Sequence, residues 1–348
     1  MVNHKVSLII LNFNGWKDTI ECLESIYQIN YPNYDVILVD NASSDNSIDK
    51  IKHYCKGKLK VESSFFEYEK QNKPIDFLEI TKEESESISK LDLSNKRLIL
   101  IKNKDNYGFA EGNNIGIRFA LKYLKSDYVL LLNNDTIVDK NFLKEMINVT
   151  GDKIGIVGSK IYFYDSPKLI QSAGVKINWY LGEVDEIGRR KKKKFNKIKE
   201  VESVSGCSML INKEIFNEIG LIDNSYYLYY EDTDFCIRTL KEGFKVVFTP
   251  YSKIWHKTSV TSRKTTGLRE FYSFRNLFLF MNRYSSKIQF FSFFLYFFCF
   301  KLWFNSVIII IHHKELSAFT PFLKGIYNGV KLISLKEKVG KKKNKHIV

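Results

Sequence analysis

The chain has 348 residues, 44% of them hydrophobic, which is enough for a sizeable core in one large domain with an appendage or in two domains. Its formal net charge of +15 indicates an anionic partner, such as a phosphorylated ligand, an anionic membrane or nucleic acid. Five scattered cysteines without metal-ligand or redox spacing argue against a disulfide framework and favour a reducing, cytosolic compartment.

The first part of the chain alternates between short apolar runs and amphipathic segments. Apolar runs at residues 6–11, 36–39 and 98–101 predict buried strands, and a helical repeat through Ile20, Leu23, Ile26 and Tyr27 follows the first run. This succession is typical of a doubly wound, mostly parallel α/β sheet flanked by helices. No GxGxxG motif follows the first strand, so the dinucleotide-binding fingerprint is missing.

Two segments depart from this alternation. Residues from about 56 to 96 predict an insertion at the edge of the sheet, made of a strand pair and a helix. Residues 182–199 predict a loop, which carries the cationic run 189–194. Six consecutive cations favour a solvated, mobile surface loop, and contact with an anionic membrane or a phosphate-rich acceptor is the alternative. Further strands are predicted at residues 154–158, 160–164, 204–211 and 246–248.

The segment from Tyr128 to Asp135 is the centre of the predicted fold. It begins as an apolar run and ends in three polar residues, Asn133, Asn134 and Asp135. Such a run predicts a strand buried on both faces, and open α/β sheets bind ligands at the carboxyl ends of their strands. A lone carboxylate beside amides suits a hard divalent cation next to phosphate, whereas an Asx turn leaving the strand is the alternative.

A glycine-rich segment precedes that central strand. Gly108, Gly112 and Gly116 recur at four-residue spacing at the start of a predicted helix. They allow close approach to the backbone, and the helix N-terminus supplies N–H groups for an anion. The alternative interpretation is a helix start that packs closely on the sheet.

Three carboxylates stand close together in the second half of the chain, at Glu231, Asp232 and Asp234. Like charges at this spacing raise at least one pKa, which suits a general base. The alternative is a set of helix N-terminal acids favoured by the helix dipole. His256 follows the last predicted strand, and a lone histidine is either a structural hydrogen-bonding group or a metal ligand.

These motifs, taken in order, resemble those of family 2 glycosyltransferases with the GT-A fold, and within them the rhamnosyltransferase-like branch. The resemblance covers roughly residues 5–280 apart from the insertion, and its motifs are SLIILNFN at residues 7–14, VDNASSD at 39–45, NYGFA at 106–110, LNND at 132–135 and YEDTDF at 230–235. The match is specific for the family but not for the sugar.

The resemblance implies a role for each matching position. The base pocket of a nucleotide sugar would be lined by Leu11, Asn12, Phe13, Asp40 and Asn41, where the family commonly has a second Asp in place of Asn41. Asn114 would lie near the ribose or the pyrophosphate, and Asn134 would meet the ribose. Asp135, the retained acid of the family's Asp-x-Asp region, would hold Mg²⁺ or Mn²⁺ together with His256. Asp232, with Glu231 beside it, would be the catalytic base of a direct displacement that inverts the anomeric configuration.

The C-terminal part predicts a membrane-associating helical appendage. Residues 290–311 are apolar enough to cross a bilayer, but Lys301 and Asn305 lie in the middle of the run and both flanks are basic. An in-plane or re-entrant helix keeps both basic flanks on the cytosolic side, in line with the positive-inside tendency. A spanning helix and a buried core helix are the alternatives.

We therefore expect a GT-A domain at residues 1–256 and a helical segment with a basic tail at residues 257–348. The expected protein is an inverting, metal-assisted glycosyltransferase at the cytoplasmic face of the cell membrane. It would use a nucleoside-diphosphate sugar and a glycan or lipid-linked acceptor, and we expect no nucleic-acid partner. The alternatives are a nucleotide-sugar-binding or membrane-surface protein without transferase activity, and a nucleotidyltransferase.

Overall fold

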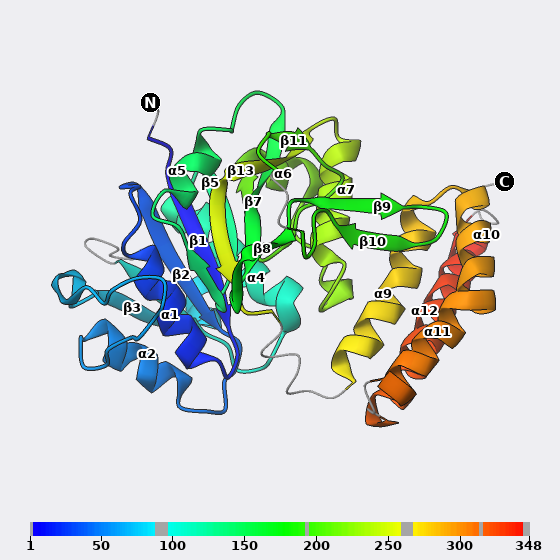
Figure 1. Cartoon of the computed structure of the whole chain (residues 1–348), viewed down its shortest axis with the longest axis horizontal. Coiled ribbons are helices and arrows are strands. Elements are labelled where there is room, and N and C mark those ends of the chain that lie inside the picture. The colour runs from blue at the N-terminus through cyan, green and yellow to red at the C-terminus, as the bar shows by residue number, and fades with distance from the viewer. Residues whose placement is uncertain (1–2, 88–96, 192–194, 259–266, 313–315, 344–348) are drawn as a thin grey trace. The chain divides into compact units, whose positions relative to one another are not determined.

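The computed structural model describes residues 3–87, 97–191, 195–258, 267–312 and 316–343 (Figure 1). The chain divides into two compact units. The first comprises Met1–Lys176, Glu186–Tyr227 and Glu231–Thr261, and the second comprises Ile177–Asp185, Leu228–Tyr230 and Ser262–Val348. The basic residues 192–194 of the expected loop lie outside the described residues.

The first unit is built on one large mixed sheet with the strand order β11-β13-β7-β12-β5-β1-β2-β4-β3. The strands are β1 (Val6–Asn12), β2 (Tyr34–Asp40), β3 (Phe77–Thr81), β4 (Leu98–Lys102), β5 (Tyr128–Asn133), β6 (Thr136–Val138), β7 (Ile154–Phe163), β8 (Ser166–Ser172), β11 (Lys199–Glu200), β12 (Ser208–Asn212) and β13 (Lys245–His256). The half from β3 to β5 is parallel throughout. In the other half β12 runs antiparallel to β5 and β7. The expected α/β sheet is therefore confirmed, with a mixed second half.

Helices cover both faces of this sheet. They are α1 (Trp16–Ile26), α2 (Ser47–Cys55), α3 (Lys82–Ser87), α4 (Gly108–Phe119), α5 (Phe142–Ile147), α6 (Lys213–Ile219) and α7 (Glu231–Lys241). Alternate residues of β1 contribute to the hydrophobic clusters on opposite faces of the sheet. Leu8 belongs to a buried cluster with Leu23 of α1, whereas Ile9 belongs to the opposite cluster with Ile115 of α4. Successive side chains of a strand point to opposite faces, which explains why these central strands are apolar throughout.

The glycines of α4 bring that helix close to the sheet. A Cβ on Gly112 would lie 2.7 Å from Leu11, and one on Gly116 would lie 2.7 Å from Ile9. A side chain at either position would therefore force Leu11 or Ile9 to shift. The alternative interpretation of this segment, close packing of a helix on the sheet, accounts for both glycines.

The structure corrects four predicted strands. Residues 154–158 and 160–164 form the single strand β7 rather than two strands. The strand predicted at residues 204–211 is shorter, because β12 begins at Ser208. β13 is longer than residues 246–248 and includes His256 as its last residue, so this histidine lies within the strand and not after it.

The insertion and the basic loop also differ from expectation. Among the described residues of the insertion there is one strand, β3, which adds to the sheet edge beside β4, one α-helix, α3, and a short 3-10 helix at Lys70–Asn72. The strand pair was therefore wrong for residues 56–87, and residues 88–96 lie outside the described part. The segment 182–199 is not a continuous loop, because β10 (Glu183–Glu186) pairs with β9 (Val175–Asn178) in a separate two-stranded sheet.

The second unit is mainly helical. It contains α9 (Leu268–Tyr284), α10 (Lys287–Tyr296), α11 (Leu302–Val307) and α12 (Leu316–Lys343), with π-helical turns on both sides of α11. The rings of Phe278 and Phe297 lie 4.8 Å apart, and those of Phe274 and Phe322 lie 4.6 Å apart. A Cβ on Gly325 would lie 2.4 Å from the carbonyl oxygen of Phe271, so α12 and α9 are in backbone contact.

Candidate active site

An acid and an imidazole meet at the carboxyl end of β5. The Oδ1 atom of Asp135 lies 3.1 Å from the Nε2 atom of His256. Asp135 is the last residue of the turn after β5, and the next residue, Thr136, opens β6 and pairs with His256 in β13. The short strand β6 thus carries the chain from β5 across to β13, although β12 and β7 separate those strands in the sheet.

The electrostatics of this pair favour its charged form. Burial by itself would raise the pKa of Asp135, but the neighbouring His256 outweighs burial and keeps that pKa below its usual value. Burial would lower the pKa of His256, and Asp135 more than compensates, so that pKa is raised. Both side chains are almost completely buried, at 9% and 8% exposure, which keeps water from screening them.

Gln171 of β8 orients the imidazole. Its Oε1 atom lies 3.1 Å from the Nδ1 atom of His256. A carbonyl oxygen accepts hydrogen bonds, so Nδ1 carries the proton that it donates to Gln171, and Nε2 faces Asp135. Once a cation displaces the proton on Nε2, an imidazole held in this way presents Nε2 as a metal ligand. The sequence analysis missed Gln171, because nothing in the local sequence marks a glutamine as the partner of a distant histidine.

The pair can contribute two ligands to a divalent cation. In the described part of the chain, no group of three or more His, Cys, Asp and Glu side chains could hold a metal ion. A carboxylate and an imidazole suit Mg²⁺ or Mn²⁺ when diphosphate oxygens and water supply the remaining ligands. The residues present therefore fit a metal that arrives with a phosphorylated ligand, and not one held by the protein alone.

The three acids at the start of α7 have three different environments. Asp234 accepts hydrogen bonds from the Tyr226 hydroxyl at 3.0 Å and from Nε of Arg238 at 2.8 Å, so it is part of the local framework. Asp232 accepts from the backbone N–H groups of Gly206, at 2.8 Å, and Thr233, at 2.6 Å. Glu231 is buried, and its Oε2 has no hydrogen-bond partner among the described residues.

These environments affect the pKa values of Glu231 and Asp232 differently. Burial raises the pKa of Glu231 well above its usual value, and the charge of Asp232 adds to this effect. Burial also raises the pKa of Asp232, while its two backbone hydrogen bonds oppose the shift. Burial therefore favours the neutral form of Glu231, whereas Asp232 retains hydrogen bonds that stabilise its carboxylate. This arrangement supports Asp232 rather than Glu231 as the base.

Glu186, at the end of β10, also belongs to this region. Burial raises its pKa to about 7; a hydrogen bond from Ser172 opposes the shift, and the charge of Asp232 adds to it. The sequence analysis did not select Glu186, because it assigned this residue to an exposed loop. An alternating pattern in the sequence GEVDE, starting at Gly182, could have indicated the strand but not its contact with distant residues.

The residues expected to line the base pocket lie at the ends of β1 and β2. The Nδ2 atom of Asn12 donates to Oδ1 of Asp40 at 2.6 Å, and Ser43 donates to the same carboxylate from its backbone N–H and hydroxyl. Leu11 and Phe13 are partly buried beside them. The predicted role of these four residues in nucleotide binding stays a prediction.

Asn41 and Asn114 make internal hydrogen bonds. The amide of Asn41 bonds to Asn103, to Asn106 and to the backbone of Tyr107 and Gly108, so it holds the loop between β4 and α4. The amide of Asn114 donates to the carbonyl of Ile222 at 2.8 Å and accepts from its N–H at 3.1 Å. Direct nucleotide contact by either amide would compete with these bonds, and it stays a prediction.

Asn134 lies between Asn12, at the end of β1, and Asp135, the next residue in the chain. Its Nδ2 atom donates to Thr19 of α1 at 2.9 Å and lies 3.5 Å from Oδ1 of Asn12. A Cβ on Gly15 would approach that nitrogen to 2.8 Å, so the turn after β1 depends on a glycine here. Its predicted contact with the ribose is untested, but the fold does bring it next to Asn12.

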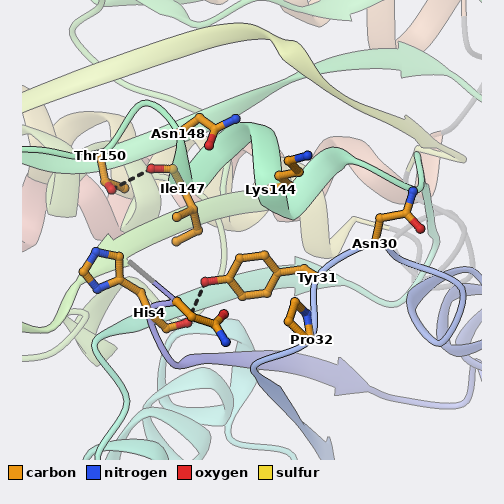
Figure 2. Close-up of a pocket in the computed structure, with 9 residues that line it drawn as sticks. His4, Asn30, Tyr31, Pro32, Lys144, Ile147, Asn148 and Thr150 are labelled. Atoms are coloured by element: carbon orange, nitrogen blue, oxygen red, sulfur yellow. Dashed lines mark hydrogen bonds between the residues drawn. The ribbon is translucent and has the colours of Figure 1, made fainter. Parts of the chain in front are cut away.

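A cavity of about 480 Å³ lies elsewhere in the first unit, as Figure 2 shows. Its lining includes His4, which precedes β1, Tyr31, which precedes β2, and Lys144 of α5. The hydroxyl of Tyr31 donates to the backbone oxygen of His4 at 2.6 Å. This cavity is therefore at the amino ends of the parallel strands, away from the edge that carries Asp135 and Asp40.

The fold and the site together define an α/β transferase of the GT-A class. The mannosyltransferase of Pyrobaculum calidifontis, solved with GDP-mannose and Mn²⁺, superposes with a TM-score of 0.55 over 95% of this chain and 88% of its own. The two sequences are 11% identical, so this likeness concerns the fold alone. The expected GT-A fold is confirmed.

Matches to known sequence families show the family to which the chain belongs. Residues 85–271 match the family described as glycosyltransferase like family 2, and residues 7–71 match glycosyl transferase family 2. The first match alone covers more than half of the chain, and the chain belongs to glycosyltransferase family 2. This membership agrees with the expected enzyme class, a glycosyltransferase of family 2.

Two curated relatives support the expected branch. The chain is 27% identical over 190 residues to the low-salt glycan biosynthesis hexosyltransferase Agl10 of Haloferax volcanii, covering 52% of this chain and 59% of the relative. It is 25% identical over 187 residues to the dTDP-rhamnosyl transferase RfbF of Shigella flexneri, covering 51% and 61%. The chain spans about three-fifths of the length of these relatives, and their names agree with a rhamnosyltransferase-like branch.

Proposed function

We propose that this enzyme transfers a hexosyl or deoxyhexosyl group from a nucleoside-diphosphate sugar to a hydroxyl group of a glycan or lipid-linked acceptor, with inversion at the anomeric carbon. The observation that carries the proposal is the Asp135–His256 pair with its 3.1 Å contact, at the same sheet edge as Asn12 and Asp40. A bound Mg²⁺ or Mn²⁺ would neutralise the charge that develops on the leaving diphosphate. Asp135 and His256 would hold that ion.

Asp232 is the proposed general base. Its carboxylate takes the proton of the acceptor hydroxyl while the hydroxyl oxygen bonds to the anomeric carbon and the bond to the diphosphate breaks. The hydrogen bonds from Gly206 and Thr233 fix the orientation of the carboxylate. Its raised pKa improves proton uptake at neutral pH, since a base is most effective when its pKa lies near the working pH.

A ligand screen tests the donor half of the proposal. Thermal unfolding would be recorded with a panel of nucleoside-diphosphate sugars, with and without Mn²⁺. A donor that binds the folded state raises the melting temperature by mass action, and we expect Mn²⁺ to increase that shift. The absence of any nucleotide-dependent shift, with and without metal, would contradict the proposed function.

The second unit is proposed to bind the cytoplasmic face of the membrane. Among the described residues one helical stretch, Lys287–Ile310, is long and apolar enough to cross a bilayer, with a mean hydropathy of 1.9, and only 17% of its most apolar part is buried. Many of its large apolar side chains are exposed, including Ile288, Phe291, Phe300, Trp303 and Phe304. Exposed apolar surface of this extent is typical of an interaction surface.

Polar contacts on this helical stretch favour an in-plane orientation. The hydroxyl of Tyr296 donates to Glu183 at 3.2 Å, and the Nζ atom of Lys301 donates to the carbonyl of Gly182 at 3.3 Å. A spanning orientation would take this charged part of the same unit into hydrocarbon, where unpaired polar groups are costly. An in-plane helix buries only its exposed face in the lipid, and the basic side chains remain at the headgroups.

A further inference from the structure

Two segments next to the proposed metal ligands are hydrogen-bonded to helix α1. The backbone N–H of Lys257 donates to the carbonyl oxygen of Asp135 at 3.0 Å. The backbone N–H of Tyr164 donates to the carbonyl oxygen of His256 at 3.1 Å. The side chains of Lys257 and Tyr164 both reach α1 and meet there at Glu21. The position of each proposed ligand is therefore linked to α1 through a neighbouring segment.

Glu21 is the centre of these contacts. Its Oε1 atom accepts from the Tyr164 hydroxyl at 2.9 Å, and its Oε2 atom accepts from the Nζ atom of Lys257 at 2.5 Å. The same Nζ atom donates to Oδ1 of Asp18, one turn earlier in α1, at 2.6 Å. It also lies 4.8 Å from the centroid of the Tyr164 ring. We call the side chains of Asp18, Glu21, Tyr164 and Lys257 the α1 clamp.

The α1 clamp is charged and largely withdrawn from water. Glu21 is 6% exposed, and the side chains of Asp18 and Lys257 are 19% and 18% exposed. Burial by itself would lower the pKa of Lys257, but its hydrogen bonds to Asp18 and Glu21 outweigh burial and raise that pKa. The ammonium group therefore stays protonated at neutral pH. Charge-assisted hydrogen bonds of this kind are among the stronger ones in proteins.

Packing of α1 on the sheet does not require these charged groups. The helix already contributes Ile20, Leu23 and Ile26 to a buried hydrophobic cluster. Replacing a buried ion pair by apolar groups is often neutral or stabilising, so the pair between Glu21 and Lys257 is weak evidence for a role in stability. Its location is more informative, because it holds the residue that directly follows a proposed metal ligand.

We propose that the α1 clamp positions Asp135 and His256 for a divalent cation, so that its members are positioning residues. The proposal rests on the function proposed above. β6 has only three residues and β13 ends at His256, so few backbone hydrogen bonds hold this corner of the sheet. Binding groups must be held within about 0.5 Å of their productive geometry. Side chains that orient metal ligands commonly change metal affinity by about 10–100-fold when they are replaced.

Charge and position predict opposite effects for Lys257. Its positive charge acts on Asp135, so removing that charge would by itself strengthen the attraction of the site for a divalent cation. Loss of the α1 clamp should instead weaken metal binding, because the segment after His256 is released from α1. A variant that loses Lys257 and Glu21 together keeps the net charge, and it therefore tests position without this electrostatic contribution.

The test uses the full chain with UDP, dTDP and GDP. Calorimetry would measure nucleotide affinity with Mn²⁺ and in EDTA, and denaturant unfolding would measure stability. The variants are Lys257→Met combined with Glu21→Leu, the single change Lys257→Met, and Lys257→Arg as the conservative change. The control is Lys52→Met combined with Glu79→Leu, which removes a partly buried ion pair between α2 and β3 and also keeps the net charge.

We expect the wild type to bind at least one nucleotide more tightly with Mn²⁺ than in EDTA. In the charge-neutral double variant of the clamp the affinity with Mn²⁺ should fall about 10–100-fold. Its affinity in EDTA and its stability should stay close to those of the wild type. Lys257→Arg should keep most of the Mn²⁺-dependent gain, because a guanidinium group can donate to both acids. The control should bind like the wild type.

Equal Mn²⁺-dependent binding by the wild type and the double variant would overturn the inference. A parallel loss of affinity with Mn²⁺ and in EDTA would overturn it too, because it would indicate a general disturbance of the nucleotide site. Stronger binding with Mn²⁺ by Lys257→Met, with unchanged binding by the double variant, would leave Lys257 an electrostatic role only and would likewise reject positioning.

A milder variant keeps the test decisive if the double variant does not fold. Tyr164→Phe removes one hydrogen bond of the α1 clamp and no charge. It should weaken nucleotide binding with Mn²⁺ but not in EDTA, and unchanged binding with Mn²⁺ would then overturn the inference. A failure of the proposed function is distinguishable, because the wild type itself would then show no Mn²⁺-dependent nucleotide binding.

Discussion

The Nε2 atom of His256 lies 3.1 Å from the Oδ1 atom of Asp135, although the two residues come from opposite halves of the chain. Pairing between Thr136 and His256 produces this contact, because Asp135 immediately precedes the strand that crosses to β13. The proposed metal site is thus a direct result of sheet pairing.

The first prediction concerns this pair. Asp135→Ala should abolish Mn²⁺-dependent nucleotide binding and sugar transfer, because one of two protein ligands is lost. The fold should persist, since it is the backbone carbonyl of Asp135 that accepts from Lys257 at 3.0 Å. Calorimetry with the nucleotide identified in the screen checks this. The control is Asp152→Ala, an exposed aspartate before β7. Unchanged turnover of Asp135→Ala at saturating donor would contradict the assignment.

The second prediction concerns the base. Asp232→Asn should bind the donor normally and lose turnover by about 10²–10⁴-fold, because an amide keeps the shape of the carboxylate but cannot take the proton. Glu231→Gln should retain most activity, since Glu231 is already kept protonated by burial. Initial rates and donor affinity of both variants check this. An active Asp232→Asn together with an inactive Glu231→Gln would mean that the base is misassigned.

The third prediction concerns the packing of α4. Gly116→Ala should lower the free energy of unfolding by about 1–3 kcal/mol, because the new Cβ would lie 2.7 Å from Ile9. Helix propensity alone predicts the opposite sign. The control for the loss of a glycine is Gly151→Ala, an exposed position outside the helices where a Cβ would meet nothing within 4 Å. Denaturant unfolding of both variants decides between packing and propensity, and a stabilised Gly116→Ala would refute the packing argument.

The fourth prediction concerns the membrane. Replacing Phe300, Trp303 and Phe304 together by serine should reduce binding to anionic vesicles, because these side chains are 65–67% exposed on the apolar helical stretch. Substitution is a better test than truncation at Lys287, since α12 packs against α9 and truncation would expose that face. Vesicle sedimentation of full-length protein provides the measurement.

The control for membrane binding is Tyr251→Ser, an exposed aromatic residue in β13 of the first unit. This variant should sediment with vesicles like the wild type. Equal sedimentation of the triple variant and the wild type, or a wild-type protein that does not sediment at all, would exclude this helical stretch as the membrane-binding element.

The fifth prediction is a pH dependence of stability in metal-free protein. The pKa of Glu186 is about 7 in the folded state, mainly through burial, with further influence from Asp232, Arg189 and His256. The folded state therefore binds this proton more tightly than the unfolded state, and stability is lost as pH rises from about 4.5 to about 7. The effect is at most about 3 kcal/mol.

Glu186→Gln removes that titration. The melting temperature of this variant relative to wild type should therefore increase between pH 5 and pH 8. Thermal unfolding in EDTA at both pH values checks the sign, and a difference that shrinks with rising pH would contradict it. Asp185→Gln, at an exposed neighbouring position, should show no such trend.

Much of the fold could be predicted from the sequence because its signals are local. Each central strand is an apolar run that ends in polar residues, and the helix before Gly220 ends at that glycine. The strand pair predicted for the insertion and the two strands predicted within β7 were wrong. Strand continuity and edge pairing depend on neighbouring strands, which a local pattern does not contain.

The candidate site could likewise be predicted only in part from the sequence. Residue types and local patterns indicate the kind of chemistry: lone Asp135 at a strand end, three acids before Phe235, and an α/β alternation without a dinucleotide fingerprint. Which of these groups meet depends on how distant strands pair. The fold brings Asp135 to His256 through β6 and places Gln171 where it orients the imidazole of His256. It also brings Glu186 near Asp232. Residue type sets what a side chain can do, but burial and long-range pairing set its pKa and its partners, and these arise only when distant segments fold together.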